Sequence, residues 1–179
     1  MLERIIISGF GGQGVMLMGR LLAYAGMIEG KKVAWMPSYG PEMRGGTANC
    51  TVLISTKEIG SPIVSHPKIL IAMNQPSLEK FESNVKEDGL IILNDSLINR
   101  EVKRNDVNVI KIPADEIADK LGNSRAANMV ILGAYVKKSG IVKMDTIFQA
   151  LEKALAGRNK KLLELNKEAL KKGAELVKD

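Results

Sequence analysis

Glycines recur near the N-terminus at a spacing that suits the binding of a phosphate. Gly9, Gly11 and Gly14 follow a short β-branched run and precede apolar residues at helical spacing, and Gly12 lies between them. Glycines let the chain turn tightly and approach an anion, while the first N–H groups of a helix point at it. Gln13 and Gly14 would supply the first of these donors. The alternative is that the glycines only let the helix pack close to the sheet.

The same glycine spacing occurs in dinucleotide-binding folds, where a further residue accompanies it. An acidic side chain about 20 positions on, at the end of the second strand, binds the ribose. The second predicted strand here ends at residues 35–38 without Asp or Glu, and Glu42 comes later, inside the next loop. A stand-alone oxidoreductase that binds NAD or FAD is therefore an alternative function, but the chain lacks the acidic residue that such proteins use to bind the ribose.

A second loop, residues 37–50, is rich in proline and glycine and carries groups that recognise other molecules. It contains Ser38, Tyr39, Glu42 and Arg44. The Arg44 guanidinium could bind a carboxylate or phosphate with two hydrogen bonds, or pair with Glu42 at the surface. In a parallel sheet both loops leave the carboxyl ends of their strands, where open α/β sheets bind ligands. We expect them to form one binding or docking rim.

Polar residues at other strand ends are expected at the same rim, but they do not form an acid–base set. Asn74, Gln75, Asn94 and Asp95 follow two short apolar runs. Of these only Asp95 could act as a base, and no histidine or carboxylate partner accompanies it. The rim therefore predicts binding without catalysis by this chain alone.

The chain offers few groups for chemistry, since its 179 residues include one cysteine, Cys50, and one histidine, His66. One cysteine cannot form a disulfide framework, a zinc finger or a cysteine-ligated iron–sulfur cluster. A serine–histidine–aspartate triad would need His66, which lies in a turn-like stretch beside Pro67 and is expected to be a solvated loop residue. We expect no catalytic residue and no metal site.

The basic net charge of +6 is concentrated near the C-terminus. Residues 137–179 hold five of these six charges, interspersed with glutamates as on the solvated face of a helix. Aromatic residues make up only 4% of the chain, too few for a base-stacking surface. No apolar run approaches the ~18 residues of a membrane span, and the N-terminal run is shorter than that of a signal peptide. We expect a cytoplasmic protein that binds neither nucleic acid nor membranes.

The order of the predicted elements indicates an α/β fold. The apolar run 5–7, the glycine loop, a helix ending at Gly30 and a strand at 32–35 form a Rossmann-like βαβ unit, for which parallel pairing is expected. Further short strands and helices alternate, and the chain finishes with helices over 144–179. The pattern predicts one domain, 1–179, with three α/β/α layers, a mostly parallel sheet and a helical C-terminal tail.

Five sequence stretches together resemble the gamma subunit of the 2-oxoacid:ferredoxin oxidoreductases. They are GFGGQGV at 9–15, PSYGPEMRGGTANC at 37–50, GSP at 60–62, MNQPS at 73–77 and NSRAANM at 123–129. The resemblance runs from about residue 4 to residue 140 and continues loosely to the end. Within the family, the chain is most similar to the 2-oxoglutarate branch, and less to the pyruvate, ketoisovalerate and indolepyruvate branches.

The resemblance implies a function only within a complex. Such complexes decarboxylate a 2-oxoacid on thiamine diphosphate, pass electrons through iron–sulfur clusters to ferredoxin and transfer the acyl group to coenzyme A. The resemblance places the thiamine site on alpha and beta subunits, and the clusters on beta or on a ferredoxin-like delta subunit. It implies no cofactor bound by this chain alone and a three-layer domain close to the catalytic subunits.

The candidate site that follows from both lines of argument is the rim of the two loops. Its residues would border the path of coenzyme A, whose pyrophosphate and 3′-phosphate suit such a loop, or would dock onto the catalytic subunits. They are Gly9, Gly11, Gly12, Gln13, Gly14, Ser38 and Arg44. A purely structural subunit, in which the glycines serve packing alone, remains the other alternative.

Overall fold

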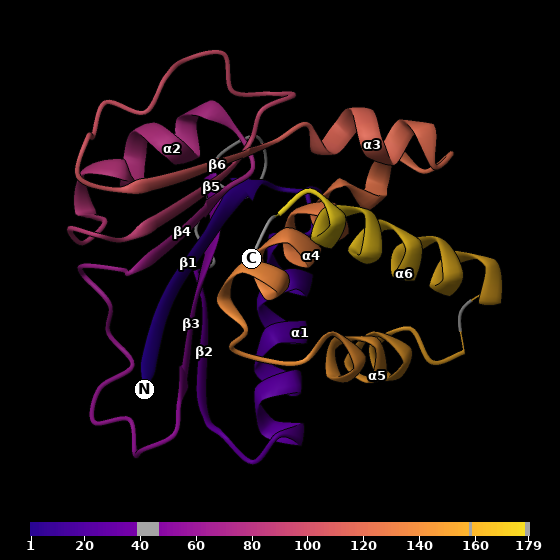
Figure 1. Cartoon of the computed structure of the whole chain (residues 1–179). Coiled ribbons are helices and arrows are strands. Elements are labelled where there is room, and N and C mark those ends of the chain that lie inside the picture. The colour runs from indigo at the N-terminus through magenta and orange to yellow at the C-terminus, as the bar shows by residue number, and fades with distance from the viewer. Residues whose placement is uncertain (39–46, 158, 178–179) are drawn as a thin grey trace.

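The computed structural model describes residues 1–38, 47–157 and 159–177 and contains a six-stranded sheet with helices on both faces (Figure 1). The strands are β1 (Leu2–Phe10), β2 (Lys32–Ser38), β3 (Thr47–Ser55), β4 (Ile69–Ala72), β5 (Leu90–Asn94) and β6 (Asn108–Ile112). The helices are α1 (Val15–Ile28), α2 (Gln75–Phe81), α3 (Ala114–Lys120), α4 (Ala127–Ser139), α5 (Met144–Ala154) and α6 (Lys160–Glu175), with 3₁₀ turns η2 (Glu82–Asn84) and η3 (Ser124–Ala126).

The sheet confirms the predicted fold class but not the predicted pairing of the first two strands. Its order is β2-β3-β1-β4-β5-β6. β1, β4, β5 and β6 pair in parallel, whereas β3 is antiparallel to both of its neighbours. β1 and β2 therefore run in the same direction but do not touch, and the expected direct parallel pair is wrong.

The sequence of β3 explains why this strand lies between β1 and β2. Only residues 39–46 join β2 to β3, and a parallel connection needs a dozen residues or more. Every residue from Val52 to Ser55 is buried, as suits an inner strand. β2 instead carries the charged Lys32 and also Pro37, which has no N–H to donate, and both are typical of an edge strand.

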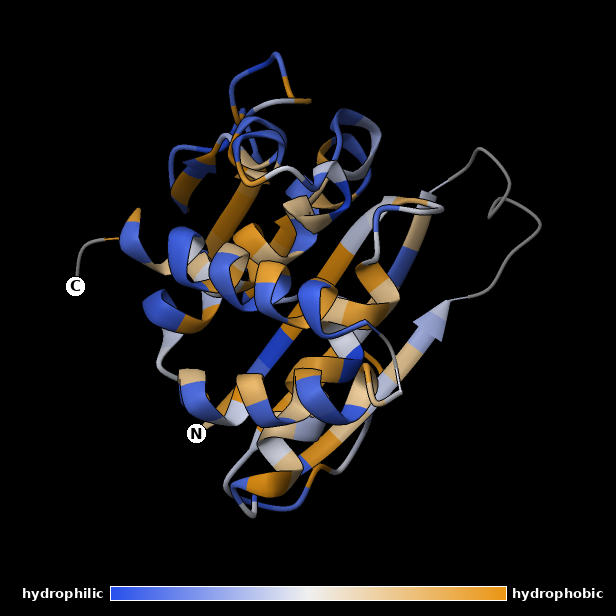
Figure 2. Ribbon diagram, turned by 90° about the vertical axis from the view of Figure 1, so that its right-hand side faces the viewer, coloured by the Kyte–Doolittle hydropathy of each residue, from blue (hydrophilic) through white to orange (hydrophobic). Residues whose placement is uncertain are grey.

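The larger core lies on the face of the sheet that α1 and α4 cover. β1 contributes Ile5 and Ile7, and α1 contributes Met18 and Leu22, all fully buried. α5 packs against α1 and α6 against α4, so these two helices form the outermost layer, with hydrophilic residues on their outward side (Figure 2). α4 is buried at all ten positions from Ala127 to Val136, because it lies between the sheet and this outer layer.

α4 and α6 approach so closely that only glycine fits at two positions. A Cβ added at Gly133 would lie 1.9 Å from the carbonyl oxygen of Leu170, and one added at Gly173 would lie 1.8 Å from that of Val130. Both obstacles are backbone atoms, which cannot move aside as the end of a flexible side chain can. The predicted helical tail is therefore an integral layer of the fold.

Glu29 joins the end of α1 to the beginning of α5. Its carboxylate accepts hydrogen bonds from the Lys31 ammonium at 2.8 Å and from the backbone N–H of Lys143 at 2.7 Å. Burial alone would raise the pKa of this carboxyl, but the hydrogen bonds from Lys143 and Lys31 outweigh it and hold the pKa below its ordinary value of 4.5. The ionised carboxylate thus stabilises the contact between the two helices.

Substitution of Gly133 by alanine is expected to destabilise the protein. Alanine gains about 1 kcal/mol in helix propensity, but the clash with the Leu170 carbonyl forces α6 away from α4. We expect Gly133→Ala to lower the free energy of unfolding by about 2 kcal/mol in chemical denaturation. Gly60→Ala is the control, since a Cβ at Gly60 meets nothing within 4 Å. A Gly133→Ala variant as stable as the parent would contradict the close packing.

Substitution of Glu29 by glutamine is expected to remove a pH-dependent part of the stability. A carboxyl whose pKa is lowered by folding stabilises the protein above its unfolded pKa and loses this effect as the pH falls through its folded pKa. Glu29→Gln should therefore cost about 1 kcal/mol at pH 7, and the difference from the parent should shrink below pH 4.5. Denaturant titrations of both proteins between pH 3 and pH 7 measure this, and a difference independent of pH would disprove it.

Candidate functional site

The carboxyl edge of the sheet brings the first loop to the end of three parallel strands. β1, β4 and β5 all end there, and the antiparallel β3 begins there, with Ala48 opposite Gly9. The glycine loop (residues 9–14) connects this edge to α1. The glycine loop therefore lies at the strand ends, as expected, and the start of β3 lies beside it.

Gly9 and Gly14 in the glycine loop have a structural reason. A Cβ at Gly9 would lie 2.9 Å from Met73 Cβ, and one at Gly14 would lie 2.2 Å from Asn128 Nδ2 on α4. Gly14 also has φ of +74° and is the N-cap of α1. Because Gly14 has no side chain, no side-chain cap satisfies the first N–H groups of α1.

Gly11 and Gly12 have a different setting, because both are exposed. Gly12 has φ of +96°, and a Cβ placed there would meet nothing within 4 Å. The packing explanation for the glycines therefore applies to Gly9 and Gly14. It leaves Gly11 and Gly12 available to a ligand or a partner.

Gln13 holds the loop in place instead of offering a donor. Its backbone N–H donates to the Phe10 carbonyl at 3.1 Å, so the expected anion donor at this position is already used. Its side-chain oxygen accepts from the Phe10 N–H at 2.7 Å and from Asn74 Nδ2 at 2.9 Å. Its Nε2 donates to the Met73 carbonyl at 3.3 Å. Gln13 is thus a positioning residue that ties the loop to the end of β4.

Asn74 and Asn94, expected at the open rim, are buried inside the same network. Asn74 Oδ1 accepts from the Ser77 N–H at 3.0 Å and caps α2. Asn94 Nδ2 donates to the Met73 carbonyl at 3.3 Å, and its Oδ1 accepts from the Ala114 N–H at 3.2 Å at the start of α3. Their hydrogen-bonding groups serve the fold, and neither faces a ligand.

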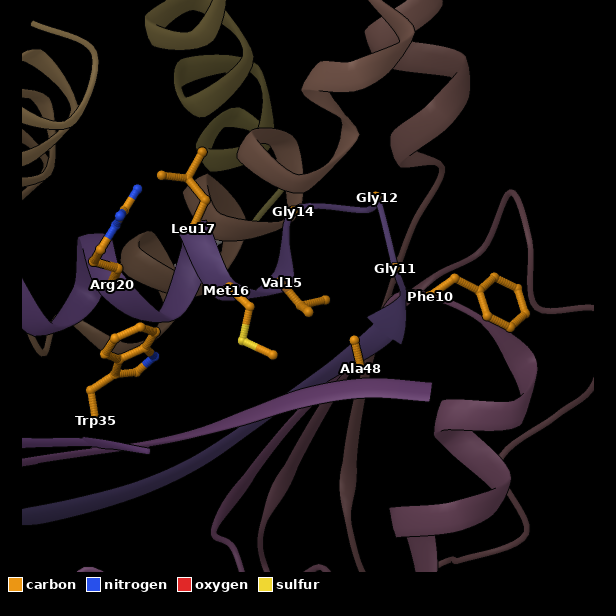
Figure 3. A pocket seen from close by; sticks show the side chains of 10 residues that line it. All are labelled: Phe10, Gly11, Gly12, Gly14, Val15, Met16, Leu17, Arg20, Trp35 and Ala48. Atoms are coloured by element: carbon orange, nitrogen blue, oxygen red, sulfur yellow. The ribbon is translucent and has the colours of Figure 1, made fainter. Parts of the chain in front are cut away.

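A cleft of about 380 Å³ opens between the glycine loop, the first turns of α1, and strands β2 and β3 (Figure 3). Its lining residues are Phe10, Gly11, Gly12, Gly14, Val15, Met16, Leu17, Arg20, Trp35 and Ala48. Arg20 is the charged member of this set and is exposed, and Trp35 forms the wall below it. The cleft therefore combines glycine-loop backbone, one cation and apolar walls.

Sequence reasoning missed Arg20 and Trp35 as site residues. Arg20 lies one helical turn after Met16, and Trp35 lies on the α1 face of β2, opposite Val52. The helical spacing of Met16 and Arg20 was a usable signal, since residues four apart share a face of a helix. Trp35 could not be placed next to α1 without knowing that β3 separates β2 from β1.

Of the second loop, residues 37–50, the structure describes residues 37–38 and 47–50. Ser38 is exposed at the end of β2, opposite Asn49, on the face of the sheet that does not border the cleft. The structure thus does not bring Ser38 together with Gly11 and Gly12. Arg44, Tyr39 and Glu42 lie outside the described residues.

The position of β3 also bears on the dinucleotide alternative. The ribose-binding acid of those folds stands at the end of a strand adjacent to β1. Here the end of β2 lies two strand spacings from β1, about 10 Å away. The missing acid and the displaced strand together argue against NAD or FAD in this cleft.

Neither Cys50 nor His66 lines the cleft. Burial raises the pKa of the Cys50 thiol to about 11, so it stays protonated and unreactive near neutral pH. His66 is exposed in the connection between β3 and β4. Among residues 1–38, 47–157 and 159–177, no three His, Cys, Asp or Glu side chains come together as metal ligands. None of the helices described is both long and apolar enough to cross a membrane.

Comparison with known proteins identifies relatives along nearly the whole chain. The family model described as pyruvate ferredoxin/flavodoxin oxidoreductase matches residues 4–176. Ketoisovalerate oxidoreductase subunit VorA of Methanothermobacter thermautotrophicus is 40% identical over 178 residues, covering 98% of this chain and 36% of that protein. The chain thus spans about a third of the length of this relative.

Two other relatives match from end to end. 2-Oxoglutarate synthase subunit KorC of Methanocaldococcus jannaschii is 34% identical over 182 residues, covering 100% of this chain and 96% of that one. The crystal structure of a keto/oxoacid ferredoxin oxidoreductase gamma subunit from Geobacter sulfurreducens has a TM-score of 0.82 at 28% identity, with 97% of each chain covered. The resemblance inferred from the motifs is thereby confirmed, and the chain belongs to the pyruvate ferredoxin/flavodoxin oxidoreductase family.

Proposed function

We propose that this chain is the gamma subunit of a multi-subunit 2-oxoacid:ferredoxin oxidoreductase and that its cleft borders the path of coenzyme A. The observation that carries the proposal is a cleft of glycine-loop backbone with one exposed arginine, in a family member without an acid–base set among its described residues. A subunit of this kind would act together with alpha, beta and ferredoxin-like delta subunits. Its electrons would reach ferredoxin only through those partners.

The residues present fit coenzyme A better than the other cofactors of such a complex. Coenzyme A presents phosphates, which suit the exposed backbone of Gly11 and Gly12, the uncapped start of α1 and the Arg20 guanidinium. Its pantetheine arm also has methyl and methylene groups that the walls around Trp35 could contact. The single buried cysteine cannot hold a cysteine-ligated iron–sulfur cluster, so in this proposal the clusters belong to the other subunits, and the family resemblance assigns thiamine diphosphate to them as well.

In this proposal the chain contributes positioning. The thiol of coenzyme A is the group that would accept the acyl product. The glycine loop, fixed by Gln13, would orient phosphates at one end of the ligand, and Arg20 would neutralise part of their charge. Gly9 and Gly14 keep this loop close to the sheet. Arg44, which the sequence suggests as a phosphate-binding or docking residue, is a further candidate for this site.

For the substrate we propose 2-oxoglutarate, giving succinyl-CoA, carbon dioxide and reduced ferredoxin. The support is that the KorC relative is a separate subunit that this chain matches over 96% of its length. Ketoisovalerate is the second candidate, because the VorA relative is more similar in sequence, at 40% identity.

The substrate proposal predicts a preference that can be measured on the complex. We expect the complex that co-purifies with this chain to reduce ferredoxin faster with 2-oxoglutarate and coenzyme A than with ketoisovalerate and coenzyme A. The measurement is kcat/KM for each 2-oxoacid at saturating coenzyme A. A higher kcat/KM for ketoisovalerate would assign the second candidate.

The cleft proposal predicts that Arg20→Ala raises the KM for coenzyme A. Loss of one exposed hydrogen-bonded ion pair to phosphate costs about 1 kcal/mol, which is about a fivefold change, and kcat should stay the same. Lys57→Ala is the charge-matched control, since Lys57 is exposed just beyond β3 at the opposite edge of the sheet.

The same measurement separates the two forms of the rim hypothesis. A raised KM in a fully assembled complex supports a contact with coenzyme A, and loss of assembly supports docking through the cleft. If neither KM nor assembly changes in Arg20→Ala and in Arg44→Ala, both forms are wrong and the glycines serve packing alone.

A further inference from the structure

The sheet face that carries α2 is left open by the described residues at the end of β2 and the start of β3. α2 lies on the opposite side of the sheet from α1 and α4, and it packs on β1 and β4 (Figure 1). A row of cross-strand neighbours shows the change along this face: Ile6 is 5% exposed, Thr51 is half-buried and Met36 is 42% exposed. In this row the cover given by α2 therefore does not extend to β2, although Leu53, in the next row on this face of β3, is fully buried.

The exposure on β3 is informative because β3 is an inner strand. It is hydrogen-bonded to β1 on one side and to β2 on the other, so its side chains can be exposed only through the face of the sheet. On this face Asn49 and Thr51 are half-buried, whereas Leu53 and Ser55, further along the same strand, are buried. The exposure thus belongs to the start of β3 on this face and not to a sheet edge.

The side chains at the end of β2 and the start of β3 carry no charge, and the charged Lys32 on the same face lies at the far end of β2, where it pairs with Glu58. We call this uncharged surface the open face and define it by Ala34, Met36, Ser38, Asn49 and Thr51. The outermost helix α6 is very different, since it contains five lysines and three glutamates. Charged residues are depleted from the centre of protein interfaces and methionine is enriched there. The open face has the composition of an interface, and α6 has that of a solvated surface.

The lengths of the relatives indicate what covers the open face. The same domain occurs as a separate chain in KorC, where 96% of the relative is matched, and within a chain about three times as long in VorA, where 36% is matched. In the long relatives the remaining two thirds or so of the chain are tethered to this domain. Where the domain is a separate chain, an interface must replace the tether.

We infer that the open face is the docking surface for the subunit that corresponds to the remaining two thirds of the long VorA-type chains. This rests on the proposed function, because it requires that the chain works in a complex. The partner surface is uncharged and covers the exposed end of β2 and start of β3, as α2 covers β1 and β4. The cleft beside Arg20 lies on the other face and stays open in the assembled complex.

A pair of methionine substitutions tests the inference in the complex co-purified with the tagged chain. Met36→Glu places a charge in the open face, whereas Met27→Glu makes the same change on α1, where Met27 is 61% exposed. A buried unpaired charge is costly, so we expect Met36→Glu to weaken recovery of the larger subunit at least about tenfold. Met27→Glu should assemble like the parent.

A second measurement needs no substitution and so does not depend on the folding of a variant. Hydroxyl-radical oxidation of methionine reports access of solvent to the thioether. We expect oxidation of Met36 to fall severalfold between the isolated chain and the complex, while that of Met27 stays unchanged.

The outcomes distinguish this inference from the proposed function. If Met36→Glu assembles like the parent, or if Met36 stays as oxidisable in the complex as alone, the open face is not the docking surface, and the proposed function still stands. Equal loss of assembly in both variants also overturns it. If the parent chain recovers no larger subunit at all, the proposed function itself fails.

Discussion

The site depends on one backbone carbonyl, that of Met73 at the end of β4. It accepts hydrogen bonds from the side chains of Gln13 and Asn94, each at 3.3 Å, and so joins the glycine loop to the end of β5. A buried carbonyl without partners would cost about 1–3 kcal/mol, so the two amides stabilise the edge as well as shaping it. The position of the exposed Gly11 and Gly12 follows from this contact, because Gln13 fixes their loop.

Three surfaces around this edge differ in composition and in the role proposed for them. The α5 and α6 layer turns charged side chains outward, the cleft presents backbone and one arginine, and the open face presents uncharged residues. α4 makes the division possible, because its close glycine contacts with α6 stack two helices on one side of the sheet. The charged outer layer and the open face therefore lie on opposite sides of the sheet.

Local patterns predicted the elements well and their arrangement less well. The helix after Gly14, its end near Gly30 and the C-terminal helices are all present, because capping and periodicity depend on neighbouring residues. The insertion of β3 depends on long-range pairing, which no local pattern contains. The same limit explains why the motif glycines were found and Trp35 was not.

The candidate site shows a further limit of motif reasoning. Asn74 and Asn94 were expected at a binding surface because they follow strands, and Gln13 because it precedes a helix and could donate to an anion. In fact their amides satisfy backbone groups at the ends of β4, α2 and α3. A sequence gives the residue type at a strand end, but it does not tell whether the side chain turns inward to the fold or outward to a ligand.

The burial of Cys50 has a consequence for handling the protein in air. Its thiol is the sole sulfhydryl of the chain, and it stays protonated behind α1, out of reach of solvent. The folded subunit therefore cannot form mixed disulfides or cross-linked dimers through it. Any damage that oxygen does to an assembly containing this chain by way of thiols or clusters has to begin on another polypeptide.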